Sequence, residues 1–286
     1  MTLQYWFMFP ISVLIATVAM GVGVGGATFF APLFILALGL PPEVAIGTGL
    51  ITEVFGFASG IVAYARRRLI DYKLGFVLLS ASVPMAVLGA WVAGFIDPGI
   101  LKAILGIGLF AVATSFLRTP DKKRVSLLDR AIKEEYGEGK SRTCVTTADG
   151  ERICYTVCNR FEGMATTGLG GLFVGMISTG LGEVNEFFLL KRCRVPSRVS
   201  IATTVFVVAV TALAGSAGHV ANFLRLGGET LTTVLSIVLF TVPGVILGGQ
   251  FGARVSSLVP QRISIRVMGV LFAIVGALTL GEAILR

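Results

Sequence analysis

The stretch Pro41-Pro42-Glu43-Val44-Ala45-Ile46-Gly47-Thr48 recurs 155 residues later as Pro196-Ser197-Arg198-Val199-Ser200-Ile201-Ala202-Thr203. At this offset Pro, Val, Ile and Thr coincide, Gly25 matches Gly180, and Gly60 matches Gly215. Further along, Val83-Pro84 recurs as Val242-Pro243, with a leucine and a glycine after each pair. Weak internal symmetry in an apolar chain is typical of secondary transporters, whose substrate site lies where the repeats meet.

The composition is that of a membrane protein. Of the 286 residues, 55% are hydrophobic and 14% are charged, whereas a soluble domain carries roughly 25% charged residues. Apolar runs of about 20 residues, the length that crosses a bilayer, lie at 44–65, 74–95, 99–117, 199–221, 231–253 and 263–285. Two further apolar stretches, 5–38 and 163–190, are interrupted by glycines. We expect a polytopic α-helical protein of the plasma (inner) membrane.

Three parts follow from the charge distribution: a first transmembrane repeat at 1–117, a hydrophilic insertion at 118–160 and a second repeat at 161–286. The insertion carries ten basic and seven acidic residues and is too small for an enzymatic domain. It is expected to contain an amphipathic helix near 125–136 and then a hairpin that turns at Asp149-Gly150.

The positive-inside rule gives the topology. If 163–190 is a re-entrant hairpin, 21 of the 24 basic residues lie inside, and only Lys102, Arg225 and Arg286 lie outside. The termini are then external and the insertion is cytosolic. The predicted fold is all-α, with two inverted-topology repeats, each a glycine-broken re-entrant segment plus three transmembrane helices. The alternative is a parallel four-plus-four arrangement. The net charge of +8 reflects this rule, so no nucleic-acid partner is implied.

The glycine-rich breaks are the candidate substrate site. A broken helix directs free N–H groups and a positive dipole end at an anion, although small residues also serve close helix packing. No preceding strand supports a nucleotide-binding loop. No Arg or Lys lies in the middle of a span, so the site would depend on backbone N–H groups and neutral side chains. The candidate binding residues are Gly23, Gly25, Gly26, Thr28, Thr48, Ser178, Thr179, Gly180, Gly182, Asn185, Thr203 and Thr204. Thr48 and Thr203 are repeat-equivalent and would form a symmetric pair.

Acidic residues inside membranes are functional candidates. Glu53 and Glu183 are the candidates for proton coupling. Glu186 is expected to be an interfacial carboxylate that pairs with Lys191 or Arg192. His219 is interpreted either as a satisfied interfacial histidine or as a proton relay.

The cysteines and the histidine do not indicate a cofactor. The chain has one histidine, His219, and four cysteines, Cys144, Cys154, Cys158 and Cys193. A zinc site would need further ligands beside them. The hairpin would bring Cys144 opposite or next to Cys154. In a cytosolic insertion reduced thiols are the default, so we expect structural thiols.

The segment Gly175-Met176-Ile177-Ser178-Thr179-Gly180-Leu181-Gly182-Glu183-Val184-Asn185 closely resembles the TauE/SafE family, as do residues 195–204 and the glycine run at 21–26. The resemblance covers both repeats. It implies a secondary transporter of small sulfur-containing anions such as sulfite or sulfonates, which we expect to be an exporter without a cofactor.

Three other functions compete with this one. A passive anion channel of the same architecture would need a continuous pore and no coupling carboxylate. A membrane sensor or scaffold would use the insertion at 118–160. An integral-membrane enzyme is disfavoured because the chain has one histidine. The N-terminus lacks the positive region and cleavage site of a signal peptide.

Overall fold

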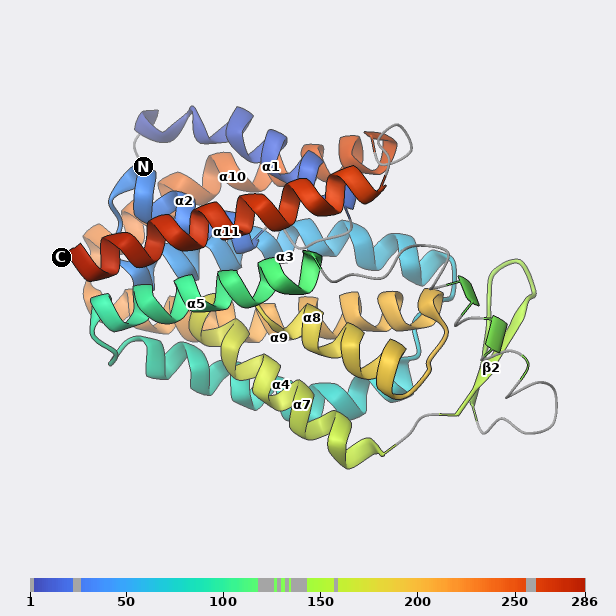
Figure 1. Cartoon of the computed structure of the whole chain (residues 1–286). Coiled ribbons are helices and arrows are strands. Elements are labelled where there is room, and N and C mark those ends of the chain that lie inside the picture. Colours follow the sequence, from blue (N-terminus) through green and yellow to red (C-terminus); the bar gives the residue numbers. More distant parts are fainter. Residues whose placement is uncertain are drawn as a thin grey trace.

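The computed structural model describes residues 3–22, 27–117, 126–127, 130–131, 134, 143–156, 159–255 and 261–285. Over these residues the chain is a bundle of long helices with one small β-hairpin, as Figure 1 shows. The first half contains η1 (Leu3–Tyr5), α1 (Met8–Val22), α2 (Ala27–Leu38), α3 (Pro42–Arg66), α4 (Tyr72–Ala93) and α5 (Pro98–Leu117). After β1 (Thr143–Thr146) and β2 (Arg152–Tyr155), the second half contains α7 (Arg160–Ile177), α8 (Leu181–Glu186), η2 (Phe187–Arg192), α9 (Ser197–Leu226), α10 (Gly228–Val255) and α11 (Gln261–Leu285).

The apolar helices confirm a multi-pass α-helical membrane protein. Among the described residues, α3, α4, α5, α9 and residues 228–251 of α10 are long and apolar enough to cross a bilayer, and α1, α2 and α11 add shorter apolar segments. The repeated prolines mark helix starts. Pro41 and Pro196 immediately precede the first residues of α3 and α9, where a fixed φ and a missing N–H are tolerated.

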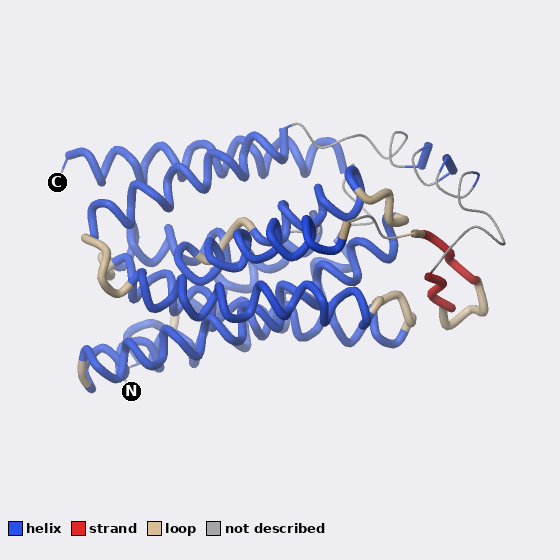
Figure 2. Tube along the Cα trace, turned by 90° about the horizontal axis from the view of Figure 1, so that it is seen from below, coloured by secondary structure: helices blue, strands red, loops and turns tan. Residues whose placement is uncertain are grey.

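The bundle has two distinguishable ends. The β-hairpin lies beside the α3–α4 connection and the start of α9, because the Ala148 N–H donates to the Arg67 carbonyl at 3.0 Å and Arg198 pairs with Glu151 at 2.7 Å. We call this the hairpin end. The start of η1 and the last turn of α11 lie at the opposite end, which we call the terminal end (Figures 1 and 2).

The second glycine-broken stretch folds as a helical hairpin. α7 ends at Ile177 and is followed by its C-cap Ser178, and Gly180 is the N-cap of α8. Ser178 and Gly180 have left-handed backbone angles, with φ of 56° and 106°. At the base of this helical hairpin, Arg192 Nε contacts Glu162 Oε1 at 3.0 Å, so the chain returns to the end from which α7 starts. Arg192, one of the two partners expected for Glu186, thus contacts Glu162 of α7, and the pairing of Glu186 with Lys191 or Arg192 stays a prediction.

The first broken stretch runs in the opposite direction. α1 lies parallel to α10, with Phe9 next to Gly244 and Val13 next to Gly248. α2 then packs along α3, where Gly49 faces the backbone of Ala31. α1 and α2 therefore start and finish at the terminal end. Residues 23–26, which include Gly23, Gly25 and Gly26, lie outside the described residues.

Corresponding helices of the two halves pack against each other in antiparallel fashion. Gly47, near the start of α3, contacts His219 near the end of α9, whereas Gly60 near the end of α3 faces Val205 near the start of α9. α5 and α11 are also antiparallel, as the chain direction in Figure 1 shows.

Other contacts recur at a constant shift along the chain. Gly89 on α4 approaches the carbonyl oxygen of Leu172 on α7, and Gly248 on α10 approaches that of Val13 on α1. Both partners are displaced by the same 159 residues, from 89 to 248 and from 13 to 172. The α4–α7 and α1–α10 pairs are thus built alike.

Glycines allow α7 to contact α4 through the backbone. A Cβ at Gly171 would overlap the carbonyl oxygen of Ser82, and a Cβ at Gly175 would overlap that of Ala86. Lipid gives no hydrophobic drive for helix association, so close packing of small residues must stabilise such a pair. The position of the α7–α8 hairpin depends on this glycine face.

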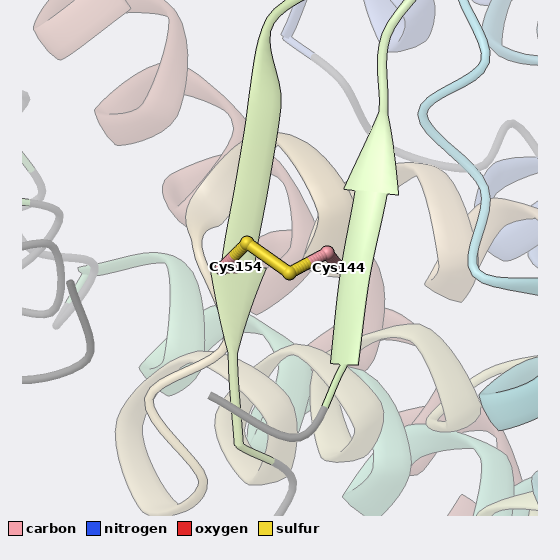
Figure 3. The surroundings of a disulfide bond; sticks show 2 residues. All are labelled: Cys144 and Cys154. Carbon is pink, nitrogen blue, oxygen red and sulfur yellow. A yellow bond between two sulfur atoms is a disulfide. The ribbon is translucent and has the colours of Figure 1, made fainter. Parts of the chain in front are cut away.

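The predicted hairpin in the insertion is confirmed, with Cys144 of β1 paired opposite Cys154 of β2. The two sulfurs form a disulfide (Figure 3), and Cys193 is also disulfide-bonded. The expectation of reduced thiols is wrong for these three residues, because the strand register holds the first two side chains together on one face. Cys158 lies outside the described residues, as does most of the helix expected at 125–136, of which residues 126–127, 130–131 and 134 are helical.

A buried tyrosine anchors the β-hairpin to both halves. The Tyr155 hydroxyl donates to Asp71 Oδ2 at 2.6 Å, and Asp71 Oδ1 accepts from the Leu74 N–H and caps α4. The Asp71 N–H donates to Thr203 Oγ1 on α9 at 3.1 Å. Burial and the Asp71 carboxylate raise the pKa of Tyr155 above its ordinary value, so the phenol stays protonated and keeps donating.

The glycine face predicts a sharp difference between two identical substitutions. Gly175→Ala should lower the free energy of unfolding in detergent by about 1–3 kcal/mol, because the new methyl group overlaps α4. Gly281→Ala on α11, where nothing lies within 4 Å of the added Cβ, should leave it unchanged or raise it by up to about 1 kcal/mol. Thermal unfolding of both purified variants checks this, and equal behaviour would contradict the packing role of Gly175.

Candidate functional site

The tips of the two broken segments meet near the middle of the bundle. Thr28 in the first turn of α2 and Thr179 in the α7–α8 break are buried, and their hydroxyl oxygens lie 3.4 Å apart. Gly108 lies beside this contact, since its added Cβ would be 3.8 Å from Thr179 Cγ2. Gly108 is in the middle of the 20-residue α5, about 15 Å from each end of that helix at ~1.5 Å per residue.

Three side chains around the second break carry buried polar atoms that no described protein atom satisfies. They are Ser178 Oγ, Asn185 Nδ2 and Thr204 Oγ1, and the residues are 2%, 0% and 8% exposed. Asn185 is held in place because its Oδ1 accepts from the Thr167 hydroxyl at 2.7 Å, which leaves the amide N–H groups to donate. An unmatched buried polar group costs about 1–3 kcal/mol. Such a set suits a ligand that accepts hydrogen bonds.

The α8 helix packs against α9 near Gly182. A Cβ at Gly182 would touch Val208 Cγ2 at 4.0 Å, so this glycine serves the contact between α8 and α9. After η2 and residues 193–196 the chain returns along α8 as α9. Asn185 is about one turn beyond Gly182 and Thr204 is about one turn before Val208, so the two lie at similar levels.

Glu183 lines a cavity of about 530 Å³ between α5, α7 and α8. Ser115, Thr179 and Glu183 supply its polar side chains, and the other lining residues are apolar or glycine. The Glu183 carboxylate also accepts from the backbone N–H of Gly180, as the third helical residue does in a capping box. A resident carboxylate thus occupies the positive end of the break.

The structure does not bring Thr48 and Thr203 together. The Thr48 hydroxyl donates to the Val44 carbonyl of its own helix at 2.7 Å, and Thr203 accepts from the Asp71 N–H near the hairpin end. Each is the seventh residue of its helix, and α3 and α9 are antiparallel, so the two threonines lie toward opposite ends. Glu53 is buried in α3, at 6% exposure, and is not among the described residues that line the cavity.

His219 is buried between helices, and its expected role as an interfacial histidine or a proton relay stays a prediction. It is 1% exposed and its Nε2 lies 2.7 Å from the Gly175 carbonyl, which requires a proton on Nε2. Its Nδ1 has no partner among the described residues. The side chain sits against Gly47, where α3 lacks a Cβ. It therefore joins α9 to α7 and α3 in the interior.

The sequence model of the family described as sulfite exporter TauE/SafE matches residues 8–279. The chain belongs to the TauE/SafE family. It is 24% identical over 289 residues to the "probable membrane transporter protein YunE" of Bacillus subtilis (strain 168), covering 99% of both chains. It is 26% identical over 245 residues to YjnA of the same organism, covering 82% of this chain and 85% of YjnA, and 35% identical over 97 residues to ORF9 of Sinorhizobium sp, covering 34% and 37%. Both also carry the name probable membrane transporter protein. No solved structure matches.

This TauE/SafE protein is therefore a multi-pass membrane transporter. Sequence reasoning had missed the contribution of α5, where Gly108 lets Ile177 and Thr179 approach and Ser115 lines the cavity. The two closely spaced glycines of Gly106-Ile107-Gly108 in an apolar span were the available signal. They carry no repeat match, and so they did not stand out.

A substitution distinguishes a ligand-binding role of the Thr204 hydroxyl from a structural role. Thr204→Val should abolish most transport while leaving thermal stability unchanged or higher, because it removes a buried group without a protein partner. Thr211→Val is the matched control on the same helix. It deprives the Ser82 hydroxyl of its 2.7 Å partner and should cost about 1–3 kcal/mol of stability. Equal stability losses in detergent unfolding would contradict a ligand-binding role for Thr204.

Proposed function

We propose that this TauE/SafE protein is a secondary transporter that exports small sulfur-containing anions, such as sulfite or sulfonates, by alternating access. The observation that carries the proposal is the contact between the two broken segments at mid-bundle, through Thr28 and Thr179. The unmatched donors of Ser178, Asn185 and Thr204 surround the second break. The family description supplies the class of anion.

Two inverted repeats, 1–117 and 161–286, separated by the insertion at 118–160, are part of this proposal. Two buried hydroxyl pairs support it: Thr52 with Thr241 at 2.9 Å and Ser82 with Thr211 at 2.7 Å. The second pair exchanges the halves of the first, with the same displacement of 159 residues from 52 to 211 and from 82 to 241. A two-fold axis in the membrane plane produces this exchange and also makes equivalent helices antiparallel.

The Glu183 carboxylate and a substrate anion compete for the same break. While Glu183 is ionised, its carboxylate accepts the hydrogen bond of the Gly180 N–H. Its negative charge also repels a substrate anion. Protonation of Glu183 removes that charge and frees the N–H groups for the anion. The proton and the anion then cross together in one occluded state. Neutral donors hold the anion less tightly than a bidentate arginine would, which favours release on the far side.

The membrane potential favours export of a dianion that crosses together with one proton. Sulfite that crosses with one proton carries a net charge of −1. A negative-inside potential drives that charge outward by about 2.3 kcal/mol per 100 mV. The proton gradient opposes export, so the substrate gradient and the potential together set the net flux.

Flux measurements in proteoliposomes test the function. Sulfite, sulfoacetate and thiosulfate are offered with and without an imposed pH gradient, and labelled anion is exchanged against unlabelled anion inside. A transporter shows faster uptake when substrate is present on the opposite side, whereas a channel does not. Absence of flux for all three anions, or flux without such acceleration, would contradict the proposal.

In the same assay, Glu183→Gln should abolish the response to the pH gradient while retaining anion exchange, because glutamine stays neutral at every pH. Glu186→Gln is the matched control, because Glu186 is exposed and lies three residues after Glu183 on α8. This variant should keep the response to the pH gradient. Glu53→Gln tests the other candidate carboxylate. If Glu183→Gln and Glu53→Gln both keep full gradient-driven transport, proton coupling through these residues is wrong.

We also propose that the hairpin end faces the cytosol of a bacterial-type plasma membrane and that the termini face outside. The positive-inside count of 21 basic residues supports this orientation, and the hairpin and the chain ends lie at opposite ends of the bundle. Asp149→Cys at the exposed hairpin turn, in a background without native cysteines, should be labelled by an impermeant maleimide only from the cytosolic side. Labelling from outside in intact cells would reverse the orientation.

A further inference from the structure

The β-hairpin is a strap between the two halves of the transporter. On the first half, its Tyr155 binds Asp71 and its Ala148 binds the Arg67 carbonyl, both in the α3–α4 connection. On the second half, its Glu151 pairs with Arg198 in the first turn of α9. In the proposed alternating-access cycle, a strap attached to the α3–α4 connection and to the start of α9 resists relative motion of these two elements at the hairpin end.

The disulfide that closes the strap lies where a small anion can reach it. Cys144 is exposed and Cys154 is partly exposed, and the bond joins the two strands across their register (Figure 3). Arg152 is exposed and lies two residues before Cys154 on the same strand, so its side chain projects from the same face. Its positive charge attracts an anion and stabilises a departing thiolate. Cys193, by contrast, is disulfide-bonded but 3% exposed.

We propose that the Cys144–Cys154 disulfide is a covalent sensing site for sulfite, an inference that rests on the proposed function for the identity of the anion. The sulfur lone pair of sulfite attacks Cys144 Sγ, a new S–S bond forms, and the Cys144–Cys154 bond breaks. The products are an S-sulfonate on Cys144 and a thiolate on Cys154. The total charge stays at −2, and no other oxidant or reductant takes part.

The step reverses without another reagent. When sulfite falls, the Cys154 thiolate attacks the S-sulfonated Cys144 sulfur, expels sulfite and restores the disulfide. In the opened form the strands lose their covalent closure, and the new negative charge on Cys144 lies beside Arg152. The hairpin then holds Tyr155 against Asp71 less firmly, so the α3–α4 connection moves more freely relative to the start of α9 and transport speeds up. High sulfite on the hairpin side thus accelerates its own removal.

Mass spectrometry of the purified, disulfide-containing protein tests the chemistry. After incubation with sodium sulfite, the peptide that carries Cys144 or Cys154 should gain the mass of one SO3 group, and the Cys193 disulfide should stay intact. Arg152→Gln should slow adduct formation by about threefold, the size of one exposed charge interaction. Arg225→Gln, an exposed arginine in the last turn of α9, should leave the rate unchanged. No adduct on Cys144 or Cys154, while oxidised glutathione in the same tube is sulfonated, would overturn the proposal.

Transport tests the consequence. Sulfite-treated protein is trapped with N-ethylmaleimide on the released thiol, reconstituted and assayed for sulfoacetate exchange. The expected result is a severalfold rise in initial rate over untreated protein, with no change in the Cys144→Ser, Cys154→Ser double variant under the same treatment. An adduct that leaves the rate unchanged overturns the sensing role. Failure of the transport proposal is distinct, because it removes sulfoacetate flux from every sample while the adduct still forms.

Discussion

A helix that breaks inside a membrane releases backbone polar groups that lipid cannot satisfy, and the architecture of this protein follows from that constraint. The break at Ser178 to Gly180 is enclosed by protein: the Ser178 N–H returns to the Val174 carbonyl at 2.8 Å, and the Glu183 carboxylate accepts from Gly180. The opposing segment meets it at Thr28. Each broken segment helps to shield the other from lipid, so the candidate site draws on residues of both halves.

Glycine has two separate physical roles in this arrangement. Gly180 is required for its backbone, since a φ of 106° is rarely adopted by residues with a side chain. Gly171, Gly175 and Gly89 are required for their missing side chains, because backbone atoms of a neighbouring helix occupy the space of a Cβ. The packing glycines determine how far along the bundle the break at Gly180 lies. α7 lies against α4 without intervening side chains, and this contact fixes the break at the level of the middle of α5.

Much of the fold was predictable from sequence because it depends on local signals. The apolar spans, the proline-marked helix starts and the hairpin at Asp149-Gly150 all follow from length, backbone geometry and turn chemistry. The site was less predictable, because a repeat offset identifies equivalent positions without saying where they meet. Thr48 and Thr203 match in sequence, yet the antiparallel packing of α3 and α9 puts them toward opposite ends, whereas Thr28 and Thr179 meet without matching. Burial of His219 likewise depends on Gly47, from a helix distant in sequence.

The β-hairpin breaks the symmetry that the helices suggest. The α3–α4 connection, where the strap attaches, corresponds in the second half to the junction of α9 and α10, which is the single residue Gly227. A strap is thus built at the hairpin end, while the corresponding junction at the terminal end is too short to receive one. In the proposed inverted-repeat mechanism, two-fold related halves would otherwise give the inward-facing and outward-facing states similar contacts. A device that holds the halves together at one end stabilises the state closed at that end, and it shifts the population by its own binding energy. In the proposed alternating-access mechanism, the insertion therefore sets the balance between the two states without touching the substrate.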